Sequence, residues 1–382
     1  MVSSKRTGAA LLFCFALGAF AQNTEGGRWL DVDFPRDSPV LPVTFSLGPA
    51  TTVRPLGASM GLDLHASLLL RNTGSKTISG LTLRVEAQDL NPAGKGSVTV
   101  PSLQVRPGEF FPVSINLRLQ RPFSLGKNEG AVVQVSLDCA LFADFSSYGP
   151  DQLHSRRALM VYELQARRDR LYLSELLRAG LWPRIREELN FGSQDLHLPQ
   201  LGFELLRDAA TGVRRESALP VGTMSFPSAP VQATSGAAQV AGNEVRAPRI
   251  EVKNMSQRPV RGVDMGWIVR DEQGRDFMAG SVPSQVKLNG VEAGTITESG
   301  TLRFSRGAGQ PLMIGALLAF VNDVEFVDGK LWIPSRSDIE TATNDPLLRR
   351  ALTNSPEQQR LAEIYRRKGR SGLEDELKRI NP

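Results

Sequence analysis

Alternating apolar and polar residues recur in short stretches along most of the chain. Leu81, Leu83 and Val85 alternate with Thr82 and Arg84, which is the period of a strand with one buried face. Buried strands are also indicated by mostly apolar runs, at 62–70, 132–142 and 312–321. Glycine (35 residues) and proline (24 residues) are frequent and place turns between these stretches. The pattern therefore predicts a mainly β fold of short strands.

One sequence pattern occurs twice. It runs from Arg71 to Gly80 and again from Lys253 to Gly262, and it consists of a base, Asn, three residues, a second base, one residue, an aliphatic residue, one residue and Gly. The shared residue, Asn72 or Asn254, can close a turn because its side chain bonds the backbone two residues further on. Apolar or alternating residues flank both segments, so each predicts a strand, a turn and a second strand.

A second pair of segments matches at almost the same separation along the chain. Phe142–Pro150 and Phe326–Pro334 share the spacing of Phe, Asp, an aromatic residue and Pro. The Asp suits a tight turn, and Pro ends a strand because it has no N–H to donate. A weaker match joins Val105–Gly108 to Val291–Gly294. These matches predict that the chain holds two copies of one structural unit.

Each unit offers about seven short strands over roughly 120 residues, which is the pattern of an antiparallel sandwich. In the segment Ile250–Gly274, a strand, Asn, a polar turn, Gly-Val and a second strand lead to Asp-Glu-Gln-Gly. This segment resembles the small immunoglobulin-like modules of the FxLYD and CARDB type, which are common in bacterial exported proteins. The resemblance implies an immunoglobulin-like fold and a role in binding, spacing or assembly.

Residues 155–189 have a helical texture instead. The stretch 155–179 is rich in Arg, Glu and Leu and contains no Gly or Pro, and Gly180 can cap the C-terminal end of a helix there. A second short helix is predicted over Pro183–Leu189, with Pro in its first turn. These residues therefore predict a helical connector between the two units.

The C-terminal residues also predict helices. Asp345-Pro346 opens one helix, Asn354–Glu357 opens another that Gly369 ends, and 371–380 add a last turn or two. The simpler interpretation places these helices on the sheets or between the units. The alternative is a docking tail with anchors on one helix face, at Leu361, Ile364 and Tyr365.

We therefore predict a mainly β fold class, with two repeated immunoglobulin-like antiparallel β-sandwiches, a helical connector and a C-terminal helical tail. The connector and the tail are the stretches rich in Arg and Glu. In chain order the domains are a signal peptide (1–21), the first sandwich (30–152), the connector (153–215), the second sandwich (216–340) and the tail (341–382).

The N-terminus has the pattern of a secretory signal peptide. Lys5 and Arg6 precede an uncharged run, 9–21, that ends in Ala-Phe-Ala. This pattern predicts cleavage between Ala21 and Gln22 and export to the periplasm or beyond the cell. A membrane-spanning helix needs about 20 apolar residues, more than this run or any later one supplies. We therefore expect no transmembrane segment after cleavage.

The inventory of chemically reactive residues is small. Cleavage leaves Cys139 as the single cysteine, and its apolar run favours a small buried side chain over a reactive or intermolecularly paired thiol. The mild basic excess includes no basic stripe interleaved with aromatic residues, so we expect no nucleic-acid partner. His65, His154 and His197 lie far apart and without metal-ligand spacing. We therefore assign no catalytic, cofactor-binding or metal-ligating residue.

Carboxylates do cluster in both units, at Asp138, Asp144 and Asp151 and at Asp323, Glu325 and Asp328. Their recurrence favours a shared structural role in a turn. A hydrolase that uses Asp144 and Asp328 is one alternative. A carbohydrate-binding surface is another, and its candidate aromatic residues, which more often fill a core, are Trp267, Trp332 and Tyr148.

The repeat and the missing catalytic motifs together favour an exported, non-catalytic binding or scaffold protein of the bacterial envelope. We expect its partner to be another envelope protein, with a glycan as the alternative ligand. We predict no enzymatic activity and no cofactor.

Overall fold

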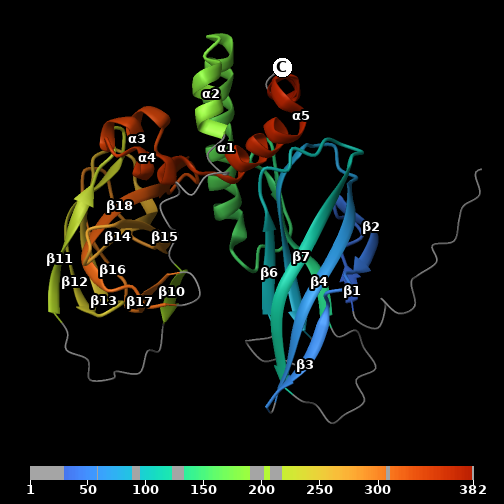
Figure 1. Ribbon diagram of the computed structural model, residues 1–382, viewed down its shortest axis with the longest axis horizontal. Coiled ribbons are helices and arrows are strands. Elements are labelled where there is room, and N and C mark those ends of the chain that lie inside the picture. Colours follow the sequence, from blue (N-terminus) through green and yellow to red (C-terminus); the bar gives the residue numbers. More distant parts are fainter. Residues whose placement is uncertain are drawn as a thin grey trace, which may run out of the picture. The chain divides into compact units, whose positions relative to one another are not determined.

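The computed structural model describes residues 30–57, 59–87, 95–122, 133–189, 202–206, 217–306 and 310–380 (Figure 1). Strands hold 49% of the residues and helices 24%, so the predicted mainly β fold class is confirmed. The predicted signal peptide (1–21) and His197 lie outside the described residues.

The first part of the chain is built from strands. Their bounds are β1 Leu30–Asp33, β2 Val40–Leu47, β3 Thr52–Leu56, β4 Ser59–Asn72, β5 Ile78–Ala87, β6 Lys95–Val100, β7 Phe110–Pro122, β8 Val133–Phe142 and β9 Ser147–Tyr148. One sheet has the order β1-β8-β5-β6, with β9 paired to β8. A second sheet has the order β2-β4-β3, with β7 paired to β4.

A larger sheet follows later in the chain. Its strands are β10 Gly202–Leu206, β11 Ser217–Met224, β12 Val231–Ala241, β13 Glu244–Asn254, β14 Val260–Asp271, β15 Asp276–Ser284, β16 Ala293–Thr297, β17 Thr301–Ser305, β18 Ile314–Phe326 and β19 Leu331–Trp332. Their order is β10-β17-β13-β12-β11-β18-β14-β15. In addition, β16 pairs with β13 and β19 pairs with β18.

The helices begin and end close to the predicted residues. Gly180 has a φ of 68°, and its N–H donates to the Leu177 carbonyl at the end of the first helix. The Asp345 carboxylate accepts the Leu347 N–H at 2.8 Å, and Gly369 interrupts the last helix with a φ of 66°. No helix in the described ranges is both long and apolar enough to cross a membrane. The helices are α1 Ser155–Arg178, α2 Trp182–Leu189, α3 Arg336–Ala342, α4 Pro346–Thr353 and α5 Pro356–Ile380.

The sheets are not purely antiparallel, which corrects the predicted architecture. Strand β1 runs parallel to β8, with Leu30 opposite Val133, and β11 runs parallel to β18, with Val221 opposite Leu317. A parallel pair needs a long connection between its strands. Here the intervening strands supply that connection, so an early strand of each half lies beside a late one.

Two elements lie outside the classes predicted for their ranges. Strand β10 falls within 153–215, which was expected to be helical, and α3 begins within 216–340, which was expected to be a sandwich. Leu205 of β10 lies opposite Leu302 of β17 and packs against the core of the large sheet. The strand forms through this distant pairing, which its short local sequence does not reveal.

Contacts divide the chain into two compact units. Unit 1 comprises 1–71, 83–98 and 110–137, and unit 2 comprises 72–82, 99–109 and 138–382. The division passes through β5 and β8, whereas the sequence placed a boundary at residue 152. The turn segments of the first sheets therefore belong to the same unit as α1 and the large sheet.

In β5, for which one buried face was predicted, Thr82 is buried together with Leu81 and Leu83, so the alternation there is wrong at this position. Strands β4 and β7 of unit 1 do alternate buried and exposed residues. Leu64 and Leu68 of β4 are buried, as are Val113 and Ile115 of β7. Ser67, between the two leucines, is exposed. One face of this pair of strands is therefore apolar and buried, and the other is polar.

The core of unit 2 lies within the large sheet. The predicted buried strand at 312–321 corresponds to β18, in which Leu317, Ala319 and Val321 are buried. Packing is close at Gly266, where an added Cβ would lie 2.2 Å from the Phe320 ring. Glycine is therefore required at this position, because real Cβ atoms do not approach a ring so closely.

Candidate functional site

The two matched segments make the same hydrogen bonds. The Asn72 side-chain N–H donates to the Lys76 carbonyl, and the Asn254 side-chain N–H donates to the Arg258 carbonyl, both at 2.9 Å. In each case the Asn Oδ1 accepts the N–H two residues further on, at 3.0 Å. Both Asn residues are fully buried. The prediction that this Asn closes a turn is confirmed.

The shared base and the shared Asp also form equivalent ion pairs. Lys76 Nζ lies 2.7 Å from Asp144 Oδ2, and an Arg258 nitrogen lies 2.8 Å from Asp328 Oδ2. Each carboxylate also accepts the N–H of the residue two positions later. The Lys76 bond holds the pKa of Asp144 below its usual value, and the backbone N–H bond does the same for Asp328. Both Asp residues therefore remain ionised and close a turn.

The same two bases lie over the matched aromatic rings. Lys76 Nζ is 5.7 Å from the centre of the Phe142 ring, and the Arg258 guanidinium is 3.6 Å from that of Phe326. A cation within about 6 Å of a ring face is attracted to it. Asn, base, Phe and Asp thus act as one structural group in each segment.

The remaining carboxylates of the first cluster build the start of α1. Asp138 accepts the Ser155 hydroxyl at 3.0 Å and the Leu153 N–H at 3.3 Å. Asp151 accepts the Arg156 N–H at 3.0 Å. Acceptors at a helix N-terminus satisfy backbone donors that have no partner within the helix. These carboxylates therefore have a structural role.

The aromatic residues considered for a sugar surface are mostly covered. Trp267 is 3% exposed. Trp332 is half-buried beside Phe226, with its indole N–H donating to the Ser228 hydroxyl at 3.3 Å. Tyr148 is also half-buried. The structure does not bring the three rings onto one exposed platform, because Trp267 is part of the core.

The described histidines and the cysteine do not form a reactive group. His65 bonds the Asn116 side chain on the neighbouring strand, and His154 precedes α1 with a φ of 53°. Cys139 is buried with Leu141 and Leu159, as predicted. Burial raises the pKa of the Cys139 thiol to about 12. The thiol is therefore protonated at neutral pH and is a poor nucleophile.

Helix α5 packs against helices of its own chain. Leu361 is fully buried in a cluster with Leu173 of α1 and Ile185 of α2, and Ile364 and Tyr365 pack against the same cluster. The docking-tail hypothesis is therefore wrong for Leu361, which is not accessible to an external partner, whereas Ile364 and Tyr365 are half-buried. Their helical spacing reflects packing within unit 2, since an apolar helix face serves an internal and an external partner equally well.

Three carboxylates of the large sheet converge on Arg157, in the first turn of α1. Arg157 donates to Asp323, its Nε lies 3.2 Å from Glu325 Oε2, and its Nη1 lies 3.9 Å from Asp264 Oδ2. Asp264 is on β14, whereas the other two acids are on β18. We call these four residues the Arg157 cluster.

Strand pairing places two of these acids side by side. Strands β14 and β18 are antiparallel, with Asp264 opposite Asp323, and the two carboxyl groups bond each other. The Ser281 hydroxyl donates to Asp264 at 3.0 Å, and the Asn322 amide donates to Asp323 at 3.3 Å. Both groups thus belong to a local hydrogen-bond network.

The acid pair holds a proton at neutral pH. Asp323 is 1% exposed and Asp264 is 8% exposed. Burial first, and then the neighbouring Asp264, raise the pKa of Asp323 to about 8, against the lowering effect of Arg157. Burial also raises the pKa of Asp264. The two carboxyl groups therefore share one proton at neutral pH.

The charges of the cluster balance once the neighbouring Arg261 is included. One ionised carboxylate of the pair and Glu325 oppose Arg157 and Arg261, whose Nη1 is 3.5 Å from Glu325 Oε1. Two carboxyls that share a proton can act as an acid–base pair when a substrate reaches them. Here both are more than nine-tenths buried, so the arrangement favours a structural ion pair between α1 and the large sheet.

Sequence reasoning missed this cluster. The run of acids at 323–328 includes Asp323 and Glu325, but it does not point to Asp264 or Arg157. A signal was present: Asp264 lies between Val263 and Met265, so a charge interrupts an apolar strand. Buried charges require partners, and that interruption alone predicts an ion pair without naming the partner.

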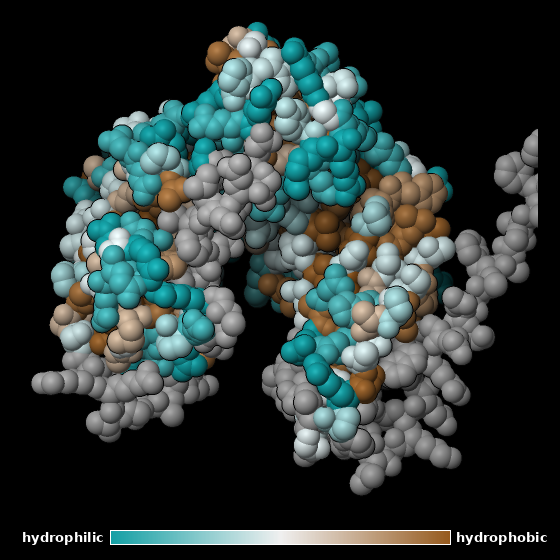
Figure 2. Space-filling view, in the orientation of Figure 1, coloured by the Kyte–Doolittle hydropathy of each residue, from teal (hydrophilic) through white to brown (hydrophobic). Residues whose placement is uncertain are grey.

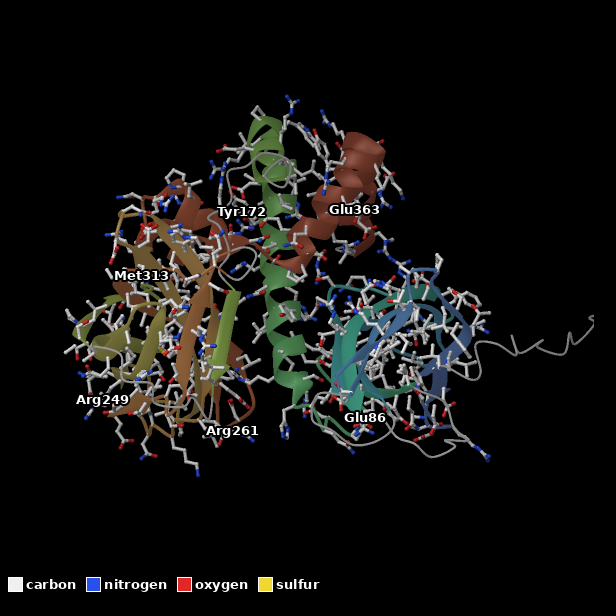
Figure 3. The ribbon with its side chains drawn as sticks, turned by 60° about the horizontal axis from the view of Figure 1, so that its bottom comes forward. Glu86, Tyr172, Arg249, Arg261, Met313 and Glu363 are labelled. Carbon is white, nitrogen blue, oxygen red and sulfur yellow. The ribbon has the colours of Figure 1, made fainter. Side chains whose placement is uncertain are left out.

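Further buried charges join α1 to the C-terminal helices. Arg170 lies 3.0 Å from Glu163 and 3.4 Å from Glu357 of α5, and all three are nearly inaccessible. Asp169, also fully buried, lies 2.8 Å from Arg336 of α3. Tyr172, labelled in Figure 3, lies beneath the same guanidinium. Helix α1 is thus fixed by ion pairs on several sides.

Comparisons with known proteins identify no family. No family model and no curated protein matches the chain. A β-glucosidase structure from Kluyveromyces marxianus is 9% identical over 72% of this chain and 45% of that one, with a TM-score of 0.15. The CBM32-1, CBM32-2 and M60 catalytic domains of Clostridium perfringens ZmpB are 9% identical over 84% and 40%, with a TM-score of 0.11. The chain spans less than half of each, and neither likeness carries an argument.

Proposed function

We propose that this chain is an exported, non-catalytic binding or scaffold protein of the bacterial envelope. In this proposal two copies of an immunoglobulin-like module are held by charged helices. The observation that carries it is the shared group of Asn, base, Phe and Asp, which makes the same contacts in both segments. A repeated module whose shared residues are all structural fits a spacer or binding role.

Ionic contacts of α1 add support. A flexible linker would present its charges to water, whereas Glu163, Asp169 and Arg170 are buried against other elements of unit 2. Removing one partner from a buried ion pair is strongly destabilising, so such contacts favour one arrangement over others. We infer that α1 is a rigid structural element of unit 2. A scaffold requires such an element to hold its binding surfaces at a constant spacing.

The two alternatives have weaker support. A hydrolase would need a carboxylate pair that a substrate can reach, yet Asp144 and Asp328 each close a turn with their own base. A sugar-binding platform would need exposed rings, and Trp267 is buried. Trp332 and Tyr148 keep partial exposure, so a glycan remains the second candidate ligand.

The proposal is tested by cross-linking the tagged full chain in the envelope of its native host. A partner that is recovered reciprocally, when the partner carries the tag, supports the scaffold role. The matched control is an unrelated exported protein produced at the same level. Recovery of the same proteins with that control would contradict the proposal.

A separate experiment addresses catalysis. The full chain is screened against glycan and peptide substrates beside the double variant Asp144→Asn/Asp328→Asn. The scaffold role predicts no turnover by either protein and a lower unfolding temperature for the variant. Turnover that disappears in the variant at an unchanged unfolding temperature would establish the hydrolase instead.

A further inference from the structure

Strand β7 of unit 1 lies at the edge of its sheet. It pairs with β4 along its whole length, from Phe110 opposite Arg71 to Pro122 opposite Ser59. None of the other described strands pairs with β7. Its second edge therefore carries main-chain groups that no described strand satisfies.

The register identifies these groups. The Asn72 N–H donates to the Glu109 carbonyl at 3.0 Å, at the start of the pairing. In an antiparallel pair, alternate residues direct their N–H and C=O toward the partner, and the residues between them direct theirs away. Counting from Glu109, the odd-numbered residues face β4, and the even-numbered residues from 110 to 122 face the second edge.

Both prolines of the strand occupy outward positions. Pro112 and Pro122 are even-numbered, so their missing N–H groups cost no bond to β4. Proline also blunts an edge against pairing. Between the two prolines, the outward main-chain groups of Ser114, Asn116, Arg118 and Gln120 have no partner among the described strands. We call the segment 114–120 the β7 window.

We propose that the β7 window pairs with the same window of a second copy of the chain, in an antiparallel and twofold-symmetric dimer. A register centred on Leu117 is self-complementary. Pro112 then faces Pro122 of the second copy, so the two residues that lack an N–H lie opposite each other. The residues between them keep complete pairs of donor and acceptor. Ser114 faces Gln120, and Asn116 faces Arg118, so no like charges stand opposite each other. A single register thus satisfies the whole window.

Side chains around the window permit this approach. Ser114, Asn116 and Arg118 are exposed. Arg118 Nε lies 2.6 Å from Asp63, so the positive charges of two Arg118 residues near the axis are neutralised within their own copies. Asn116 is held by His65 at 2.8 Å. The side chains that line the edge are therefore neutral or paired.

Apolar surface lies on the same sheet. Phe110, which precedes the window on β7, is 56% exposed. Figure 2 shows brown surface over the strands of this sheet. Exposed apolar side chains beside an unpaired strand are typical of an interaction site. A second copy is favoured as the occupant because one twofold contact removes the open edge from both chains at once.

The proposal deepens the scaffold role by naming a partner, and the two can fail separately, because capture of an envelope protein does not require the dimer. The first measurement is the mass of the chain beginning at Gln22, by sedimentation over a wide concentration range. We expect a monomer that becomes a dimer as the concentration rises. A monomer throughout would overturn the proposal.

The test variant is Ser114→Pro, which removes an outward N–H and leaves the bonds to β4 in place. We expect the dimerisation constant to weaken by about tenfold or more, because each copy loses a hydrogen bond. The matched control Ser114→Thr keeps the N–H and should dimerise as the parent does. A dimer that Ser114→Pro leaves unchanged would locate the contact elsewhere and overturn the proposal.

A second variant guards against misfolding of the first. In the double variant Asn116→Cys/Arg118→Cys, position 116 of one copy faces position 118 of the other across the twofold axis. Their Cα atoms are then about 5.5 Å apart, which suits a disulfide. Oxidation should then link two chains, whereas Cys139 is buried and does not compete. If the chain is monomeric but Ser114→Pro loses a captured envelope protein, a foreign strand occupies the window and the second-copy proposal is wrong.

Discussion

The exposed turn carboxylates and the buried carboxylates next to α1 use the same chemistry with opposite results. Asp144 and Asp328 each meet one base in water, and the pKa of each is lowered. Asp264 and Asp323 share one arginine away from water, and the pKa of each is raised. The number of acids per base and the access of water, rather than the residue type, decide whether the pKa of an Asp rises or falls.

This difference separates two structural tasks. An exposed ion pair contributes little stability, so the turn pairs mainly fix local geometry. A buried charge is costly unless its partner is present, so the buried charges near α1 penalise every arrangement in which their partners separate. The turn pairs thus shape each of the two matched segments, whereas the buried charges hold the helices and the large sheet in one relation within unit 2.

The largest expected effect comes from Arg170→Met. The substitution keeps much of the side-chain volume and leaves Glu163 and Glu357 without this arginine, although Arg167 and Arg360 still reach them. Loss of one partner of a buried pair costs about 3–5 kcal/mol in the free energy of unfolding. Urea unfolding followed by circular dichroism measures the change.

The matched control for that substitution is Arg367→Met. Arg367 forms an exposed pair with Glu363 of the same helix, and the loss of such a pair costs about 0.5 kcal/mol or less. Similar losses in the two variants would mean that burial does not distinguish the two kinds of charge. The comparison between exposed and buried charges would then fail.

The next effect concerns the shared asparagine. Asn254→Ala removes two donated hydrogen bonds, to the carbonyls of Arg258 and Asn289, and leaves these acceptors near a buried position. We expect a loss of about 2–3 kcal/mol, since an unsatisfied buried polar group costs about 1–3 kcal/mol. Asn72→Ala should cost a similar amount, because its bonds are equivalent. Unequal losses in parallel urea titrations would argue against two copies of one module.

Local chemistry explains what could be predicted from the sequence. Asn72, Asn254 and Asp345 act within a few residues of their own position, through turn and cap geometries that depend on short-range bonds. The helices after 154 and 345 were predicted for the same reason. Such features need no knowledge of distant pairing.

Features that depend on distant pairing escaped prediction. Asp264 and Asp323 meet because β14 pairs with β18 in one register, and a shift of one residue would separate their side chains. Strand β10 and the parallel pairing of β1 with β8 likewise depend on partners far along the chain. Apolar spacing in α5 predicted a contact face but could not tell an internal from an external partner.

A smaller effect, of opposite sign, is expected for Asp323→Asn. The folded pKa of Asp323 is about 8 and its usual value is 3.8, so between these values the folded state holds a proton that the unfolded chain has lost. The stability from this proton is complete below the usual pKa and is lost as the pH rises toward 8. Asn cannot ionise and still offers an acceptor to Arg157 and a donor to Asp264.

We therefore expect the free energy of unfolding of the parent protein to fall over that pH range more steeply than that of Asp323→Asn. At pH 8 the variant should be more stable by about 1–2 kcal/mol, because it avoids ionising a buried group. Paired urea titrations at pH 5 and pH 8 measure the difference. A variant that is less stable at both values would show that the carboxyl is ionised and paired in the folded protein.

The smallest effects are expected at the turns, with the opposite dependence on pH. The pKa values of Asp144 and Asp328 are lowered in the folded protein, so their stabilisation is present above the usual pKa of 3.8 and is lost as the pH falls through the lower folded values. Asp144→Asn and Asp328→Asn should each lower the unfolding temperature slightly at pH 7 and hardly at all in strong acid.

Both groups are exposed, so added salt should shrink the difference in unfolding temperature at pH 7. Calorimetry at the two pH values, with and without salt, measures this. A loss at pH 7 that salt leaves unchanged would mean that the backbone bonds of the Asp, and not its ion pair with Lys76 or Arg258, stabilise the turn.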